Sequence, residues 1–436
     1  MSSFEKLNLS STIVNTIKKQ GYVTPTPIQN EAIPHLLKGR DMLGIAQTGT
    51  GKTAAFSLPI IDNLLQKEIK TNSRNVRALI LTPTRELASQ IKQSINSYTE
   101  EKSLFCGVIF GGVGKKGQID MMARGSDVLV ATPGRLLDLI SDGFIKFDQL
   151  EVFVLDEADR MLDMGFIHDV KKIIALLPDN KQTMLFSATM PKTISSLAKS
   201  LLKDPVKVEV TPESSTVDKI DQRIYMVEKA DKLRLLKSTL EDKSLKSVLV
   251  FTRTKHMADR LCKELIKSKI ESAAIHGNKS QGARQKALKS FQEEKIRVLI
   301  ATDIAARGID IDHITHVVNY NLPEDAESYV HRIGRTARAG REGVAISFCE
   351  ATEVKFLKNI EKFIKIKIPI DSNHDYHIIH TKESILSEEK AQKEQKEKRL
   401  AQRRKSKPKI RNSQNAKSGN IRTKKAKDSK GRKRTR

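Results

Sequence analysis

The chain has 436 residues, enough for two or three domains, and 38% of them are hydrophobic, which excludes a wholly disordered protein. Its formal net charge is +26, but residues 390–436 alone hold 21 basic and 3 acidic side chains. The body therefore has the charge balance of an ordinary globular protein. The tail is a polycation, and its expected partner is a polyanion.

Three features predict a protein of a reducing compartment. No apolar run approaches the ~18 residues that a membrane-spanning helix requires, so no membrane partner is expected. The opening residues, Met1 to Lys6, lack the charged and apolar regions of a secretory signal. Cys106, Cys262 and Cys349 are odd in number and far apart, which argues against a disulfide framework and a zinc site. We therefore expect a cytoplasmic protein.

Two helices are predicted before the first strand. Ser10 is a good N-cap for a helix with one apolar face, and Gly21 is a typical helix end. Thr26 and Pro27 form a cap followed by proline at the first helical position, which opens a second helix reaching Leu37. Pro34 predicts a kink or an early end of that helix.

Short runs of apolar and β-branched residues follow, separated by helical patterns. Runs without polar alternation are typical of strands that are buried on both faces of a parallel sheet. Their alternation with helices predicts a doubly wound α/β domain. The expected strands are Met42–Ala46, Ala78–Leu81, Val128–Ala131, Val152–Leu155 and Met184–Phe186.

The pattern recurs in the second half of the chain. The run that starts at Leu79 (LILTPTR) resembles the run that starts at Leu249 (LVFTRTK). In both copies a second strand ending in Ala-Thr follows, with its threonine fifty residues after the first threonine of the run. Two matches in one register indicate a duplicated domain.

These patterns divide the chain into four parts. We expect a first domain over 1–208, a linker over 209–218, a second domain over 219–369 and a basic tail over 370–436. Within the tail, residues 383–402 carry the Glu/Lys spacing of a charged helix. From Arg403 onward almost no apolar residues remain, which predicts disorder.

A glycine-rich phosphate-binding loop follows the first predicted strand and precedes a helical pattern. Backbone N–H groups of such a loop surround phosphates, the lysine adds charge at the β- and γ-phosphates, and the Thr53 hydroxyl is a ligand for Mg²⁺. Alanine stands at the first position, where the general pattern has glycine. The loop comprises Ala46, Gln47, Thr48, Gly49, Thr50, Gly51, Lys52 and Thr53.

Two adjacent carboxylates end the strand at Leu155. At the carboxyl end of a parallel strand they face the crevice in which ligands of open α/β sheets bind. We expect Asp156 to hold Mg²⁺, through water, and Glu157 to orient or deprotonate the attacking water.

Two arginines of the second domain, Arg335 and Arg338, lie one helical turn apart. Arginines so placed can stabilise a γ-phosphate during hydrolysis. If they act on the nucleotide that Lys52 holds, hydrolysis requires the two domains to close. A basic face that is solvated or contacts nucleic acid is the alternative for this run, and it stays open.

From Phe4 to Pro369 the chain resembles the DEAD-box ATP-dependent RNA helicases of superfamily 2, because Asp156 to Asp159 spell the family signature. The other family motifs occur in the family order. They are the Q motif within 2–30 (Gly21 to Gln29, preceded by Phe4), Pro83 to Ala88, Gly111-Gly112, Thr132 to Arg135, Ser187 to Thr189, His276-Gly277 with Gln281 and Arg284, Thr302 to Asp310, and His331 to Arg338.

The resemblance implies two tandem RecA-like domains and a role for each matching residue. Gln29 would read the adenine, Tyr22 and Phe4 would stack on it, and Asp310 would contact the ribose. Ser187, Ala188 and Thr189 would couple hydrolysis to strand separation. The RNA backbone would be held by Arg85, Gly112, Thr132, Arg135, Arg284, Thr302 and Asp303. Ala305-Ala306 and Ala337 are similar to the bacterial RhlE-type branch.

The implied function is RNA-stimulated hydrolysis of ATP with Mg²⁺, coupled to unwinding of short RNA duplexes or remodelling of RNA–protein complexes. A nucleotide-gated RNA clamp that unwinds little needs the same motifs, and it stays open beside a DNA helicase. The tail is expected to tether RNA without sequence preference. The expected protein is a monomer, and ribosomal precursors and the RNA-degradation machinery are candidate partners.

Overall fold

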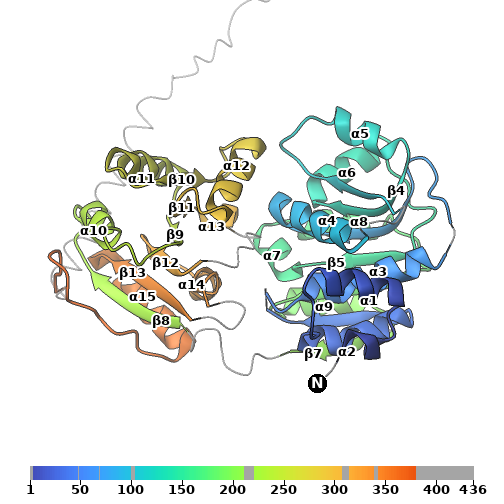
Figure 1. The fold of residues 1–436 in the computed structure, drawn as a ribbon, viewed down its shortest axis with the longest axis horizontal. Coiled ribbons are helices and arrows are strands. Elements are labelled where there is room, and N and C mark those ends of the chain that lie inside the picture. The colour runs from blue at the N-terminus through green and yellow to red at the C-terminus, as the bar shows by residue number, and fades with distance from the viewer. Residues whose placement is uncertain are drawn as a thin grey trace, which may run out of the picture. The chain divides into compact units, whose positions relative to one another are not determined.

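The computed structural model contains two parallel β-sheets, each covered by helices (Figure 1). It describes residues 3–47, 49–67, 69–99, 104–210, 220–306, 314–337 and 342–379. The predicted helix over 383–402 and the basic tail beyond it lie outside these residues, as does most of the predicted linker. Within the described ranges, no helix is both long enough and apolar enough to cross a membrane.

The first sheet has seven strands in the order β3-β4-β2-β5-β6-β1-β7, and all neighbours are parallel. The five strands expected from the sequence are confirmed as β1, β2, β4, β5 and β6. The prediction omitted β3 and β7, which are four residues each. The strands are β1 (Met42–Ile45), β2 (Val76–Leu81), β3 (Cys106–Ile109), β4 (Ser126–Ala131), β5 (Val152–Leu155), β6 (Gln182–Ser187) and β7 (Val206–Glu209).

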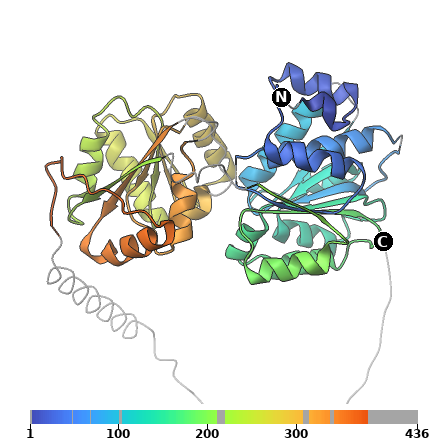
Figure 2. The ribbon, with the colours of Figure 1, turned by 90° about the horizontal axis from the view of Figure 1, so that it is seen from below.

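Helices cover both faces of this sheet, as a doubly wound fold requires (Figure 2). In β2, Ala78 and Ile80 belong to one core and Leu79 and Leu81 to the other, because successive side chains alternate across a sheet. The helices are η1 (Phe4–Leu7), α1 (Ser11–Lys19), α2 (Pro27–Leu37), α3 (Lys52–Leu65), α4 (Arg85–Thr99), α5 (Lys116–Met122), α6 (Pro133–Ser141), α7 (Ala158–Asp163), α8 (Ile167–Ile174) and α9 (Lys192–Leu201).

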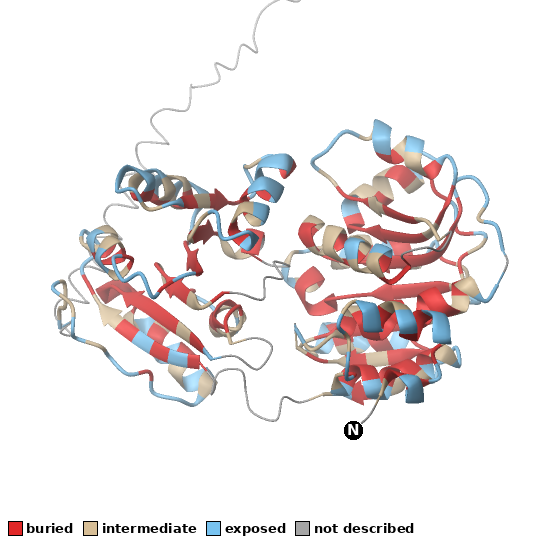
Figure 3. Cartoon of the chain, viewed as in Figure 1, coloured by how far each residue is buried: buried red, intermediate tan, exposed pale blue. Residues whose placement is uncertain are grey.

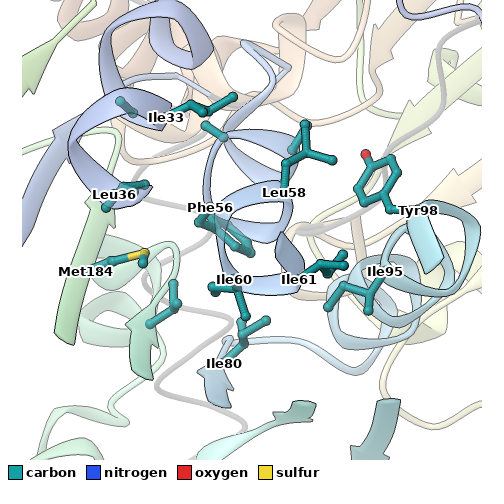
Figure 4. Close-up of a cluster of buried hydrophobic side chains, with 14 of the residues drawn as sticks. Ile33, Leu36, Phe56, Leu58, Ile60, Ile61, Ile80, Ile95, Tyr98 and Met184 are labelled. Carbon is teal, nitrogen blue, oxygen red and sulfur yellow. The ribbon is translucent and has the colours of Figure 1, made fainter. Parts of the chain in front are cut away.

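One core lies between the sheet and α1 to α4, and Figure 4 shows a part of it around Phe56. The observed ends of α1 and α2 can be compared with the ends predicted from the sequence. Ser10 caps α1 by accepting a hydrogen bond from the Ile13 backbone N–H, as expected. The predicted early end at Pro34 is wrong, since α2 continues to Leu37. Leu36, beyond the proline, is fully buried, and this packing offsets the hydrogen bond that proline cannot make.

The second sheet has six strands in the order β10-β11-β9-β12-β13-β8, again all parallel. Its inner strands are largely buried, the edge strand β8 alternates between buried and exposed residues, and its helices are exposed on their outer sides (Figure 3). The strands are β8 (Ile220–Met226), β9 (Val248–Phe251), β10 (Ser272–Ile275), β11 (Val298–Ala301), β12 (His316–Asn319) and β13 (Gly343–Cys349). The helices are α10 (Lys232–Thr239), α11 (Lys255–Lys267), α12 (Gln281–Gln292), α13 (Asp303–Ala306), α14 (Ala326–Ile333), η2 (Ala351–Glu353) and α15 (Val354–Ile364).

The repeat in the sequence has a structural counterpart. Leu79 of β2 is in register with Leu129 of β4, and Leu249 of β9 is in register with Leu299 of β11. The six strands of the second sheet follow the same order as six of the first, with β7 as the additional edge strand. The two sheets are therefore copies of one topology, which confirms the expected duplication.

The chain after Pro369 forms hydrogen bonds with β8, the edge strand of the second sheet. The backbone N–H of Asp371 donates to the Ile224 carbonyl oxygen, and that of Ile378 donates to the carbonyl oxygen of Met226. Tyr376 packs against the adjacent core. Residues 370–378 thus run beside the edge strand β8, which provides those edge groups with partners.

A buried ionic cluster fixes the start of α10 in this second fold. Lys232 is 1% exposed, and its Nζ lies 2.5 Å from Oε2 of Glu353, which is 0% exposed. Glu353 also accepts hydrogen bonds from Arg253 and Asn321. A buried ion pair of this kind is costly to break, because one charge then remains without its partner.

We predict that Lys232→Ala lowers the free energy of unfolding by about 3–5 kcal/mol, since it removes the buried cation beside the Glu353 carboxylate, whose other cationic contact, Arg253, is 43% exposed. Urea unfolding followed by circular dichroism measures this loss. Arg234→Ala is the matched control, because Arg234 lies on the same helix, is 73% exposed and pairs with Asp231. Its expected cost is below about 1 kcal/mol, and equal losses for the two variants would contradict the prediction.

Candidate nucleotide and RNA site

The predicted phosphate-binding loop connects β1 to α3. Gly49 and Gly51 have φ angles of +87° and +92°, a region that side chains disfavour and that turns the loop toward the helix start. Lys52 donates from Nζ to the Ala46 carbonyl oxygen at 2.6 Å. The Ala46 side chain is buried in the core, which accounts for alanine at this position. Thr48 lies outside the described residues.

Asp156 follows β5 and faces Lys52 across the site. Burial raises the pKa of Asp156 to about 7, although the charge of Lys52 opposes this shift. Burial likewise lowers the pKa of Lys52, against the attraction of Asp156 and Glu157. Asp156 Oδ1 is buried without a hydrogen-bond partner among the described residues. A buried carboxylate oxygen without a partner fits a water or a cation, and it thus fits the predicted magnesium site.

Glu157 has a strained backbone and a fixed carboxylate. Its φ and ψ angles of 55° and 52° are left-handed, which is uncommon for a residue with a side chain and is typical of functional sites. Arg160 Nη1 lies 3.1 Å from the carboxylate, and both side chains are buried. The sequence prediction did not include Arg160. Its spacing of three residues from Glu157 on a helix was the available signal.

Asp159 connects the acidic motif to the motif that follows β6. Its Oδ2 accepts hydrogen bonds from the Ala188 N–H at 3.2 Å, the Thr189 N–H at 2.8 Å and the Thr189 hydroxyl at 3.0 Å. The Ser187 hydroxyl accepts from the Asp159 N–H and donates to the Thr189 carbonyl oxygen. The three residues predicted to couple hydrolysis to strand separation thus contact the acidic motif directly. The sequence prediction had assigned no role to Asp159.

Gln29 joins the start of α2 to the phosphate loop. Its Oε1 accepts from the Thr26 N–H at 2.9 Å, and its Nε2 donates to the Gly51 carbonyl oxygen at 3.1 Å. A carboxamide has a second N–H and a second lone pair, which would remain for a base. A Cβ added to Gly51 would lie 2.4 Å from Gln29 Nε2, so only glycine permits this contact.

The two aromatic residues of this region occupy different environments. Tyr22 is half-buried, whereas Phe4 is 1% exposed and belongs to the core. The Phe4 ring packs edge-on against Tyr22, with 6.2 Å between ring centroids. The structure therefore places Phe4 as a support for Tyr22, which differs from the expected direct stacking of Phe4 on a base.

The predicted RNA contacts of the first domain follow β2, β3 and β4. Arg85 begins α4, and a Cβ added to Gly112 would lie 2.0 Å from Arg85 Nη1. Arg135 donates from its guanidinium to the Val113 carbonyl oxygen at 3.1 Å, and Thr132 precedes α6. Since all these strands are parallel, their carboxyl ends bring these residues to the sheet edge that also carries the phosphate loop.

In the second domain, Asp303 is held by an arginine of the next motif. Arg332 lies 2.5 Å and 2.8 Å from the two Asp303 carboxylate oxygens through Nε and Nη2. The charge of Asp303 is thus matched within the protein by the guanidinium of Arg332. The sequence prediction assigned no role to Arg332.

Of the four remaining predicted site residues, the structure describes two, Arg335 and Arg284. Arg335 is buried and donates from Nε to the His331 carbonyl oxygen at 3.3 Å. Arg284 lies in the first turn of α12. Asp310 and Arg338 lie outside the described residues.

Comparisons with known proteins agree with this geometry. Residues 26–197 match the DEAD/DEAH box helicase family, and residues 231–340 match the helicase conserved C-terminal domain. The chain is 41% identical over 365 residues to the ATP-dependent RNA helicase CshA of Limosilactobacillus reuteri, covering 84% of this chain and 72% of CshA. It is 42% identical over 371 residues to the DEAD-box ATP-dependent RNA helicase RhpA of Helicobacter pylori, covering 84% and 74%.

Two solved structures are similar in fold. S. cerevisiae Dbp5 bound to RNA and ADP BeF3 is 32% identical with a TM-score of 0.74, over 85% of this chain and 95% of that one. Mss116p bound to ssRNA and AMP-PNP is 28% identical with a TM-score of 0.76, over 85% and 79%. The two RecA-like domains expected from the sequence are thereby confirmed. With both family models matched and 41–42% identity to these relatives over 84% of its length, the chain belongs to the DEAD-box helicase family.

Proposed function

We propose that this protein is an ATP-dependent RNA helicase, in which RNA-stimulated ATP hydrolysis drives local unwinding of short duplexes or remodelling of RNA–protein complexes. The observation that carries the proposal is Asp159, which joins the acidic motif of the ATP site to Ala188 and Thr189 through its carboxylate and to the Ser187 hydroxyl through its backbone N–H. The relatives named as ATP-dependent RNA helicases and the similar structures bound to RNA and nucleotide support it.

In this proposal the phosphates bind the loop of residues 46–51, and Lys52 supplies the positive charge at the β- and γ-phosphates. Thr53 and Asp156 would hold Mg²⁺, the latter through water, and the cation would neutralise phosphate charge. Glu157, fixed by Arg160, orients the attacking water and accepts its proton. Arg335 and Arg338 stabilise the charge of the transition state.

The nucleoside is recognised by the residues before the loop. Gln29 binds the adenine edge with its remaining donor and acceptor, as carboxamides do elsewhere. Tyr22 stacks on the ring, and Asp310 contacts the ribose. Because Gln29 also holds the Gly51 carbonyl oxygen, a bound adenine and the phosphate loop position each other.

RNA is held through its backbone, without base-specific contacts. In the first domain the contacts are Arg85, Gly112, Thr132 and Arg135, and in the second they are Arg284, Thr302 and Asp303, whose carboxylate acts together with Arg332. If ATP and RNA both prefer the closed arrangement of the two domains, each raises the affinity for the other. Hydrolysis then removes that preference and releases the strand.

Further assignments belong to the same proposal. Ala305-Ala306 and Ala337 favour the RhlE-type branch, and we propose a monomer that acts in the cytoplasm. Ribosomal precursors and the RNA-degradation machinery are the proposed partners. The basic tail supplies a non-specific tether that raises the local RNA concentration.

Duplex release tests the proposed function. The wild type should release a short RNA duplex with ATP, and Glu157→Gln should bind ATP and RNA while its turnover falls by about 10²-fold or more, since the base is lost. Glu264→Gln makes the same chemical change in α11, where Glu264 is 29% exposed and pairs with Lys267, and this control should retain turnover. Little duplex release with either ATP or a non-hydrolysable analogue, while RNA stays bound, would contradict a helicase and favour the clamp.

The contact between Gln29 and the loop generates a second prediction. Gly51→Ala should raise the KM for ATP about tenfold or more, because the added Cβ displaces Gln29 and the φ of +92° becomes strained. ATPase assays at saturating RNA measure the change. Gly117→Ala, in α5, adds a Cβ with no atom within 4 Å and should leave KM unaltered. A normal KM in Gly51→Ala would refute the proposed role of Gln29.

The tail generates a third prediction. Deleting residues 403–436 should weaken RNA binding and reduce its salt dependence, because fewer counterions are released. ATPase activity at saturating RNA should stay nearly intact. A variant with the same tail length but glutamine in place of each Lys and Arg should behave like the deletion. A titration of RNA affinity against salt that keeps its slope would exclude the tether.

A further inference from the structure

The ring of Tyr22, the residue proposed to contact adenine, packs against two buried aromatic rings. Phe4 packs against it edge-on, and Tyr98 does so from another element with 5.9 Å between centroids and an interplanar angle of 84°. The Tyr22 and Tyr98 hydroxyl oxygens lie 2.8 Å apart, so one donates a hydrogen bond to the other. The orientation of the Tyr22 ring is therefore set by its neighbours.

A second contact fastens the same segment to the same helix. The side-chain amide of Gln20 donates to the Ser97 carbonyl oxygen, one residue before Tyr98. The Tyr22 N–H donates to the Ile17 carbonyl oxygen at 3.0 Å, after Gly21 has ended α1 with a φ of +83°. The segment that carries Tyr22 is thus fixed to the last turn of α4 at two adjacent residues.

Tyr98 is itself a rigid anchor. It is 3% exposed and packs with Leu58, Ile61 and Ile95, while its hydroxyl is directed away from Ile95 (Figure 4). Burial raises the pKa of Tyr98, so its hydroxyl stays neutral throughout the working pH range. The apolar cluster needs only the ring, and the hydroxyl contacts the Tyr22 hydroxyl and the Ser94 side chain.

We propose that Tyr98 is a positioning residue for the nucleobase, which holds the Tyr22 ring through the hydroxyl pair at the angle at which adenine stacks. This inference rests on the proposed role of Tyr22 at the adenine. A stacking contact depends on ring orientation, and a half-buried tyrosine without its partner would lose part of that orientation. Tyr98 therefore acts on affinity for the base and leaves phosphate binding and the chemical step alone.

Tyr98→Phe is the direct test, because it removes the hydroxyl and retains the ring. The KM for ATP should rise about threefold to tenfold, as expected for one hydrogen bond, while kcat at saturating RNA is unaltered. Inhibition by inorganic tripolyphosphate, which has no base, should be unchanged. Tyr225→Phe, on β8 against His374, makes the same chemical change elsewhere and should alter neither value. The thermal midpoint of each variant is measured in parallel.

A double-mutant cycle separates positioning from general destabilisation. Tyr22→Phe should raise KM as Tyr98→Phe does, and the double variant should add nothing, because both changes remove one hydrogen bond. Additive effects, or an equal loss of tripolyphosphate affinity, would overturn the inference.

Tyr22→Ala distinguishes this inference from the function on which it rests. If it raises KM while Tyr98→Phe does not, the inference alone is overturned. If Tyr22→Ala leaves KM unaltered, the proposed contact of Tyr22 with adenine fails and this inference fails with it.

Discussion

The parallel direction of every strand in the first sheet is the constraint on which the site depends. Because all seven strands run the same way, the loops after β1, β5 and β6 emerge at one edge, with the loops after β2, β3 and β4 beside them. The first group carries the phosphate loop, the acidic motif and Ser187 to Thr189, and the second carries the proposed RNA contacts. The proposed nucleotide site and the proposed RNA contacts therefore lie side by side because the strands are parallel.

Several charged side chains are buried at this edge of the sheet, and removing them from water costs free energy. The same charges limit which ligands can bind there. Lys52, Asp156, Glu157 and Arg160 are all largely removed from water, and each is tolerated because opposite charges surround it. Asp156 keeps one oxygen without a protein partner among the described residues. A site of this kind favours a ligand that brings both phosphate and a divalent cation.

Local patterns predicted much of the fold. Five strands of the first sheet, the capped start of α1 and the phosphate loop follow from residue order, since apolar runs and capping residues act over a few positions. The short strands β3 and β7 were not predicted, and packing around Leu36 carried α2 past Pro34. Propensity is weak compared with burial, so tertiary contacts decide such cases.

The sequence by itself determined the order of the motifs, the duplication and the residues available for each chemical role. Only the tertiary structure decided which of them touch. Asp159 at Thr189, Arg332 at Asp303 and Tyr98 at Tyr22 are contacts between side chains that the sequence leaves unconnected. A spacing along the chain specifies which face a residue occupies, whereas a hydrogen bond requires two elements to be packed at a distance that only the whole core sets.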